Sequence, residues 1–390
     1  MSDGLIFLLV VGARFLVPLL IPRFPLPAIL AALVIDAADQ TIFQQYTELD
    51  LENYQGYDKA LDVYYLTIAY VATMKNWANP IAFTAARFLW YYRLVGVTAF
   101  ELTDQRWMLL VFANTFEYFF IFYEGVRSRW NPARLGHRGV IAAVAAIWIG
   151  IKLPQEWWIH IAQLDFTDFV KEDVFGVMST STWGEGFGNR PLVTTLLLLG
   201  AVALATAAWV GARRLPDGDW SFSLDSTTVN RHLGWTAVPR PGEWAEPIRG
   251  AATVEKIALL TLVTVIFSQM LPSTEVGALE TVVAVSILVV ADAAIAMWRA
   301  ERELEWTSTF ARFGALSIVN VSLLAGYAAL ATRDDGRFNT AAGLFFAVLL
   351  TLIVVLFDRY RRLRSARLFA VGDPDDANPV TAMARPSSPG

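Results

Sequence analysis

Two aspartates, Asp36 and Asp39, follow a long apolar stretch in the segment LVIDAADQTIF (33–43). Three positions are close to one helical turn, so both carboxylates would lie on one face of a helix. A second acidic pair, Asp58 and Asp62, opens the next apolar segment, which is rich in tyrosine. Crowded carboxylates either raise one another's pKa or hold a cation. We therefore expect an acidic vestibule formed by Asp36, Asp39 and Asp62. The simpler alternative is a solvated helix end, where aspartate is ordinary; this interpretation is favoured for Asp39 and Asp58, and both remain open for Asp36 and Asp62.

Charged residues also occur inside the fourth and fifth apolar segments. Arg87 and Arg93 lie in TAARFLWYYRLVGV, and Asn114, Glu117 and Glu124 lie in FANTFEYFFIFYEG. A short loop joins these segments, so antiparallel helices would place Arg93 and Glu117 at the same depth near the bilayer centre. Because an unpaired buried charge is costly, we predict an ion pair between Arg93 and Glu117 and, less directly, one between Arg87 and Glu124. The central pair would lock a helix hairpin or act in a proton-linked pathway.

A third candidate site lies in KLPQEWWIHIAQLDFTDFVKED (152–173). Pro154 is expected to end the sixth apolar helix, and the residues after it predict an amphipathic helix on the outer surface. On that helix His160 would pair with Asp165 or Asp168 to bind a metal or to move a proton. A surface lid without chemistry is the alternative. Because the chain has three histidines and no cysteine, we predict no resident metal site.

Other motifs of catalysis or cofactor binding are missing from the sequence. The segment STWGEGFGNRP (181–191) holds three glycines but follows no predicted strand, so it is expected to be a flexible loop rather than a phosphate-binding loop. No hydrolase elbow, zinc-protease helix or nucleic-acid module occurs. We therefore assign no catalytic residue and no cofactor.

The composition is that of a membrane protein. Hydrophobic residues make up 55% of the 390-residue chain and charged residues only 17%, whereas soluble domains carry about 25% charged residues. Runs such as TLLLLGAVALATAAWVGA contain no charge over nearly the length that a spanning helix needs. The net charge of −5 is small and does not indicate a nucleic-acid partner.

Apolar runs and the breaks between them predict an all-α, polytopic helical membrane protein with about eleven transmembrane helices. Only the segment IPRFPLP separates the first two predicted helices. If these two form one broken or re-entrant unit, the number of transmembrane helices is ten. The predicted spans are 5–20, 26–42, 60–75, 81–99, 107–125, 139–153, 191–211, 254–271, 277–297, 313–331 and 339–357.

The loops between these spans alternate in charge. Arginines collect in 127–138, in 212–249, in 299–312 and from residue 359 onward, whereas 46–59, 154–176 and 272–275 are acidic or nearly neutral. Because Lys and Arg mark the cytoplasmic side, we expect the N-terminus outside and the C-terminus in the cytoplasm of a multi-pass cell-membrane protein.

Six regions follow from this arrangement. They are transmembrane helices 1–6 with the polar residues (1–153), an extracytoplasmic amphipathic helix and glycine-rich loop (154–190), transmembrane helix 7 (191–212), a cytoplasmic loop (213–252), apolar transmembrane helices 8–11 (253–358) and a basic juxtamembrane segment with a disordered tail (359–390). Membrane lipids are the expected partners, and a cytoplasmic protein would dock at 213–250.

The function that these residues favour is a transporter or channel-like protein with an acidic outward-facing vestibule for a cation, a proton or a basic solute. Its candidate pathway residues are Asp36, Asp39, Asp62, Arg93, Asn114, Glu117, His160 and Asp168. One alternative is a membrane-embedded enzyme that acts on a lipid or isoprenoid at the outer leaflet. Another is a non-catalytic membrane scaffold.

Overall fold

The computed structural model describes residues 3–47, 54–164, 166–240, 242–244, 250–270, 309–331 and 340–372, with a few isolated positions between 287 and 298. Within these ranges the chain is helical and has no strand, which confirms the predicted all-α class for this part. The side chain of Asp58, most of the predicted span 277–297, the loop 272–275 and the tail beyond 372 lie outside the described residues.

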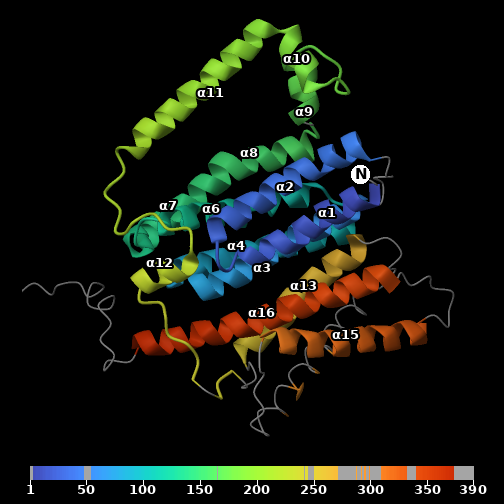
Figure 1. Cartoon of the computed structure of the whole chain (residues 1–390), viewed down its shortest axis with the longest axis vertical. Coiled ribbons are helices and arrows are strands. Elements are labelled where there is room, and N and C mark those ends of the chain that lie inside the picture. The colour runs from blue at the N-terminus through green and yellow to red at the C-terminus, as the bar shows by residue number, and fades with distance from the viewer. Residues whose placement is uncertain are drawn as a thin grey trace, which may run out of the picture.

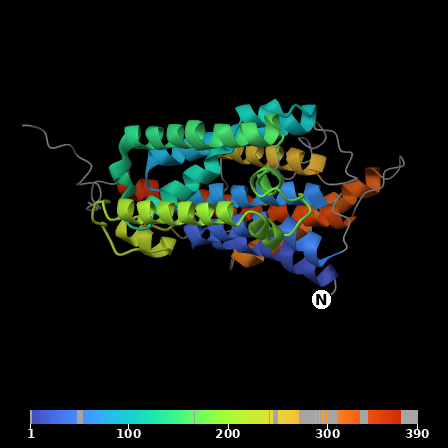
Figure 2. The ribbon, with the colours of Figure 1, turned by 90° about the horizontal axis from the view of Figure 1, so that it is seen from above.

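The longer helices run along one common axis and form a bundle (Figures 1 and 2). The α-helices are α1 (Asp3–Leu16), α2 (Pro25–Tyr46), α3 (Tyr54–Asn76), α4 (Pro80–Thr103), α5 (Trp107–Val111), α6 (Thr115–Arg127), α7 (Gly136–Ile147), α8 (Leu153–Glu156), α9 (Phe166–Phe169), α10 (Trp183–Asn189), α11 (Pro191–Ala212), α12 (Ser226–His232), α13 (Ala251–Met270), α15 (Thr309–Ala331) and α16 (Thr340–Gly372).

Helix α3 lies at the centre of the bundle. It packs against α1, α2 and α4 from the N-terminal half of the chain and against α13 and α16 from the C-terminal half. The N-terminus lies at one end of the bundle, and α12 and the C-terminal end of α16 lie at the opposite end (Figure 1). Segments far apart in sequence therefore share one core, which includes fully buried Tyr70 of α3 and Trp77, the residue after α3.

Prolines mark the beginnings of three long helices. Pro25, Pro80 and Pro191 each occupy the first turn of α2, α4 and α11. A proline is favourable there because the first backbone N–H groups of a helix have no partner within the helix. At α4 the side chain of Asn79 adds a cap, since its Oδ1 accepts from the N–H groups of Ile81 (3.0 Å) and Ala82 (3.2 Å).

The prediction that Pro154 ends the sixth span is wrong. The helix that begins at Gly136 continues through π-helical turns at Trp148–Lys152 and Trp157–Ile161, with α8 between them. Proline lacks an N–H group and its ring crowds the preceding turn, and a π-helical turn relieves that crowding by widening the helix. The residues expected to begin a surface helix therefore extend the span instead.

The predicted fifth span, 107–125, is interrupted. Helix α5 ends at Val111 and α6 begins at Thr115. The ring of Phe112, at this break, packs directly over Gly96 of α4, where any Cβ atom would collide with it. Glycine is required at position 96 because the side chain of Phe112, from its Cβ to its ring, already occupies the space that a Cβ would need. The break exposes backbone groups that take part in the site described below.

The region after Ile161 also differs from the prediction. It contains α9, a π-helical turn at Val170–Val174 and the short helix α10. Residues 183–189, predicted as flexible loop, are helical because Thr182 and Glu185 form a reciprocal capping box. Asp168 is exposed on this segment, and Asp165 lies outside the described residues.

Helix α16 continues through the basic segment that was expected to lie beside the membrane, and it reaches Gly372. Arg364 donates to the carbonyl oxygen of Trp77 (2.7 Å) and Arg367 to that of Lys75. These carbonyls end α3, where helical partners are missing, so the two arginines cap its C-terminus. Burial lowers the pKa of Arg364 and of Arg367 to about 10, which leaves both cationic at neutral pH.

The C-terminal helices carry an ionic cluster that the sequence analysis missed. Asp358 of α16 accepts from Lys256 of α13 (3.1 Å) and from Arg312 of α15, and all three side chains are buried. The three residues come from three different helices, so their pairing ties α13, α15 and α16 together.

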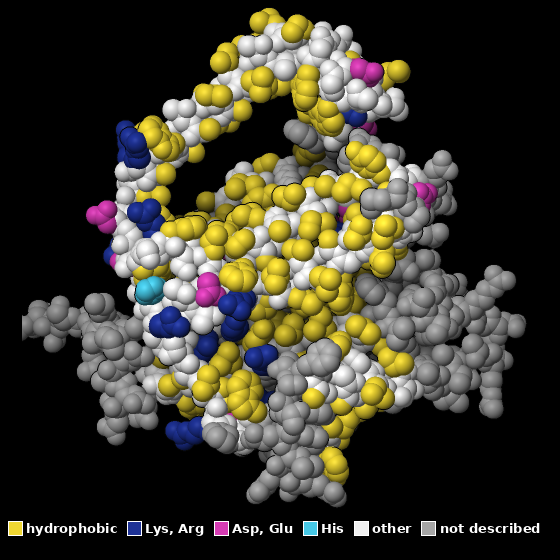
Figure 3. All heavy atoms as spheres, in the orientation of Figure 1, with side chains coloured by type: hydrophobic (Ala, Val, Ile, Leu, Met, Phe, Trp, Pro, Cys, Tyr) yellow, Lys and Arg dark blue, Asp and Glu magenta, His cyan; other side chains and the backbone are white. Residues whose placement is uncertain are grey.

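Four helical stretches of the described chain are long and apolar enough to cross a membrane: Asp3–Leu20, Trp107–Arg127, Pro132–Ile161 and Pro191–Ala212. Helix α11 stands apart from the bundle as an arch (Figure 1), and none of its residues is buried. Apolar side chains also cover much of the bundle in Figure 3. A helix that is apolar on all sides and exposed along its length is typical of a lipid-facing span.

Candidate functional site

Arg14 and three aspartates form a buried ionic cluster between α1, α2 and α3. The Arg14 guanidinium contacts the carboxylates of Asp36 and Asp39, and its Nη2 lies 2.6 Å from Oδ1 of Asp62. The side chains of Arg14 and Asp39 are 3% and 2% exposed, whereas those of Asp36 and Asp62 are 27% and 39% exposed. The cluster thus has a buried core and a face that solvent can reach.

The structure brings the three predicted aspartates together and adds the cation between them. Three carboxylates against one guanidinium leave two negative charges when all are ionised. Arg14 was missed as a site residue, although an arginine inside the apolar run LIFLLVVGARFLVPLL needs a carboxylate partner in a membrane. The need of a buried arginine for a carboxylate partner is the signal that would have identified Arg14 as a site residue.

Tyr65 lies between the carboxylates of this cluster and Glu117 at the centre of the bundle. It follows Asp62 by three residues on α3, which places the two side chains on one helical face. Its hydroxyl donates to Oε1 of Glu117 on α6. Tyr65 and Glu117 are both buried, so this hydrogen bond lies within the packed core.

The predicted ion pair between Arg93 and Glu117 is wrong. Arg93 donates to the carbonyl oxygen of Phe112 (3.1 Å), which the break between α5 and α6 leaves without a helical partner. The cation that faces Glu117 is Lys152, whose Nζ lies 3.9 Å from Oε2 and 4.2 Å from the centre of the Tyr118 ring. The prediction failed because a free backbone carbonyl competes for the guanidinium.

The other predicted pair is also wrong. Arg87 faces Glu255 of α13 across 3.9 Å, and Glu124 accepts from Trp77 and Arg127 instead. Arg127 is one turn from Glu124 on the same helix, so the local partner is available without any tertiary contact.

A second line of polar groups reaches Glu117 through Asn114. The amide nitrogen of the Asn114 side chain donates to Oε2 of Glu117 (3.1 Å), and its backbone N–H donates to Oε1 of Glu156 (3.1 Å). Oε2 of Glu156 lies 3.0 Å from Nε2 of His160. His160 therefore pairs with Glu156, one turn earlier on its own helix, rather than with the predicted Asp168, and the other predicted partner, Asp165, lies outside the described residues.

Two lines of polar side chains thus converge on Glu117. We call them together the polar chain, with the residues Arg14, Asp36, Asp39, Asp62, Tyr65, Asn114, Glu117, Lys152, Glu156 and His160. Among the described residues, no group of three His, Asp or Glu side chains has the arrangement of a metal site.

An aromatic layer separates Glu117 from Glu124, which lies two turns further along α6. Phe116, Phe119, Phe120, Tyr123 and Trp77 fill this level and are fully buried. The ring centres of Trp77 and Tyr123 are 4.0 Å apart, and those of Trp77 and Phe120 are 5.7 Å apart. Trp77 donates to Glu124, but among the described side chains no hydrogen bond joins this layer to Glu117, so the polar chain stops here.

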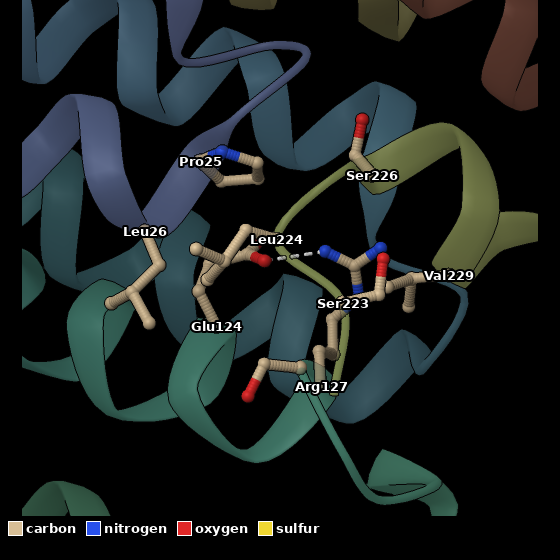
Figure 4. A pocket seen from close by; sticks show the side chains of 9 residues that line it. Pro25, Leu26, Glu124, Arg127, Ser223, Leu224, Ser226 and Val229 are labelled. Atoms are coloured by element: carbon tan, nitrogen blue, oxygen red, sulfur yellow. Dashed lines mark hydrogen bonds and ion pairs between the residues drawn. The ribbon is translucent and has the colours of Figure 1, made fainter. Parts of the chain in front are cut away.

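Below the aromatic layer, Glu124 and Arg127 are sealed by the segment that contains α12. Arg127 donates to Glu124 and, through Nη2, to Oδ1 of Asn230 (2.9 Å). Figure 4 shows Ser223, Leu224 and Ser226 closing over this pair. The remaining cavity is about 10 Å³, which holds no more than about one water molecule.

Helix α12 is held against the bundle by further contacts. Ser226 donates through its hydroxyl to the carbonyl oxygen of Pro22 (2.9 Å), and the indole of Trp235 donates to that of Lys75 (3.1 Å). Asp225 caps α12: burial alone would raise its pKa, but donation from Thr227 and Thr228 outweighs this and lowers it. The segment is thus an ordered closure of this end.

The arrangement combines a solvent-facing ionic cluster, a central glutamate and a sealed opposite end. These groups can accept and release protons or attract a small cation. Comparison of this chain with protein-family models, curated proteins and solved structures finds no match.

Proposed function

We propose that the chain is a multi-pass protein of the cell membrane with about eleven spans, its N-terminus outside and its C-terminus in the cytoplasm. The four apolar helices support membrane insertion. Lys and Arg side chains gather at the α12 end of the face shown in Figure 3, as the positive-inside rule requires of the cytoplasmic end.

This topology predicts which cysteines a membrane-impermeant reagent reaches. The native chain has no cysteine, so each introduced one reports alone. Arg138→Cys and Thr180→Cys both lie at exposed positions. In intact cells we expect labelling at position 180 and none at position 138 until the membrane is opened. Labelling of position 138 from outside would contradict the orientation.

We further propose that the protein transports protons or a small cation through an outward-facing vestibule. The observation that carries this proposal is the convergence of the polar chain on Glu117, with an aromatic layer and α12 beyond it. Intramembrane ionisable residues are costly and mark ion and proton pathways. Asp36 and Asp62 would admit the cation, Tyr65 would pass it on, and Glu117 would hold it.

The cycle requires the inner end to open. In the arrangement seen here, Glu124 and Arg127 are buried beneath α12, so we propose that a cation reaches Glu117 from the Asp62 side. Release to the cytoplasm would need the aromatic layer and α12 to move, as in alternating access. A protein partner that docks at 213–250 would act on this closure, using a surface other than the buried Val229 and Trp235.

Liposome flux measurements test transport directly. Purified protein is reconstituted with an internal dye for H⁺, Na⁺ or K⁺, and a gradient of each ion is imposed in turn. We expect flux of at least one ion, reduced at least about tenfold by Glu117→Gln, because that change removes the group proposed to take up the cation. Asp62→Asn should also slow flux.

Two exposed carboxylates serve as controls. Glu172→Gln and Asp104→Asn remove the same charges outside the polar chain, and the backbone at Asp104 has a φ of 54°, which asparagine also tolerates. Both should leave the flux unchanged. Flux no greater than in empty liposomes for all three ions, or equal flux in Glu117→Gln and Glu172→Gln, would refute the proposal.

A further inference from the structure

A groove of about 620 Å³ lies between α4 and α13, and no residue of the polar chain lines it. One wall is formed by α4 at positions 84, 87, 88, 91, 92 and 95. This spacing traces a single helical face, so the groove follows the helix axis. Ala251, Val254 and Glu255 of α13, Phe112 and Arg361 of α16 complete the lining.

One end of the groove is charged. Nη1 of Arg361 lies 3.3 Å from Oε2 of Glu255, and Nη1 of Arg87 lies 3.9 Å from the same oxygen. Tyr70 donates to the other oxygen of Glu255 and Tyr91 donates to its backbone carbonyl (3.0 Å), which holds the carboxylate in place. Two guanidinium groups against one carboxylate leave a net positive charge.

Both arginines retain donors toward the groove. A guanidinium carries five N–H donors, and in the described part of the chain only one nitrogen of each faces Glu255. The side chain of Arg87 is 41% exposed and that of Arg361 is 21% exposed. The geometry suits an anion that bridges the two, and phosphate oxygens are bound well by paired arginines.

The rest of the groove is apolar. Phe88, Val95 and Val254 are 57%, 46% and 67% exposed, with Tyr92 and Phe112 behind them. From Arg87 to Val95 the wall rises about 12 Å at 1.5 Å per residue, most of the depth of one leaflet's hydrocarbon. A soluble anion would leave this wall unused, whereas an acyl chain would cover it.

We propose that this groove binds an anionic phospholipid, with the phosphate between Arg87 and Arg361 and an acyl chain along α4 toward Phe112. The charge at one end and the apolar wall beyond it match the two parts of such a lipid. The site belongs to the membrane leaflet on the α12 side, and it is independent of the proposed transport pathway.

Native mass spectrometry of the purified full chain tests the proposal with phosphatidylglycerol and with phosphatidylcholine of the same acyl chains. We expect the unaltered protein to retain phosphatidylglycerol preferentially. The double variant Arg87→Gln with Arg361→Gln should bind it about 25-fold more weakly, since each basic side chain near an anionic headgroup contributes about fivefold. Arg138→Gln, an exposed arginine outside the groove, is the matched control and should bind normally.

A second variant keeps every charge and fills the groove. Val254→Trp should block the acyl chain and weaken phosphatidylglycerol binding, whereas Val202→Trp, an equally exposed position on α11, should not. This pair decides the outcome if the arginine variants fail to fold. Glycerol phosphate, which has the headgroup alone, should not compete. Equal retention of both lipids, or equal binding by Val254→Trp and Val202→Trp, would overturn the proposal.

Discussion

Replacing Arg14 by methionine is expected to lower the free energy of unfolding in detergent by about 3–5 kcal/mol, the usual effect of breaking a buried ion pair from one side. The reason is the surroundings of Arg14: its side chain is 3% exposed, and it contacts the three carboxylates of Asp36, Asp39 and Asp62. Without the guanidinium these carboxylates face one another. Denaturant titration followed by circular dichroism measures the loss.

Arg23→Met provides the matched control for this experiment. Arg23 lies on the turn between α1 and α2, but its side chain is 69% exposed. Its Nε is 3.9 Å from Oδ1 of Asp225. An exposed pair of that kind is worth about 0–1 kcal/mol. The double variant Arg14→Met with Asp39→Asn should recover part of the loss, because it removes the most buried carboxylate. Equal stability of Arg14→Met and Arg23→Met would show that the cluster is not a buried network.

Replacing Arg127 by methionine is expected to release α12 from the bundle. Arg127 is fully buried and joins Glu124 to Asn230, so its loss leaves a carboxylate and an amide without their partner. Val229→Cys, at a buried position of α12 itself in an otherwise cysteine-free chain, reports the release. We expect its maleimide labelling to accelerate at least about tenfold, which corresponds to about 1.4 kcal/mol of easier local opening.

The control for this prediction is Arg231→Met. Arg231 lies on the same short helix but on its exposed face, so its removal should leave the labelling of position 229 unchanged. Equal labelling rates in the two arginine variants would mean that the pair of Glu124 and Arg127 does not hold α12. If the release also permits ion flux through Arg127→Met in liposomes, the α12 closure is the inner gate of the proposed pathway.

Long-range pairing is where sequence reasoning succeeded least. The prediction of Arg93 with Glu117 assumed two uninterrupted helices, so that depth alone would decide the partners. The break at Phe112 supplied a carbonyl for Arg93, and Lys152, the last residue of a π-helical turn, faces Glu117. Neither event has a signal in the pattern of apolar residues, because both depend on how neighbouring backbones pack.

The sequence by itself determined the helical class, the membrane-type composition and the positions of most long helices. Apolar run length, proline at helix starts and the cost of buried charge act locally or through composition, so they can be read along the chain. It also indicated that Asp36, Asp39 and Asp62 belong together, since they lie at the facing ends of consecutive segments.

Only the tertiary structure decided which groups meet. Arg14 joins three helices, Glu117 collects two lines of polar groups, and residues more than 180 positions apart, such as Tyr70 and Glu255, share a hydrogen bond. The physical reason is competition: each buried donor takes the acceptor that packing brings within reach. That choice depends on helix breaks, π-helical turns and close packing, such as that of Phe112 against Gly96, which a list of residues does not specify.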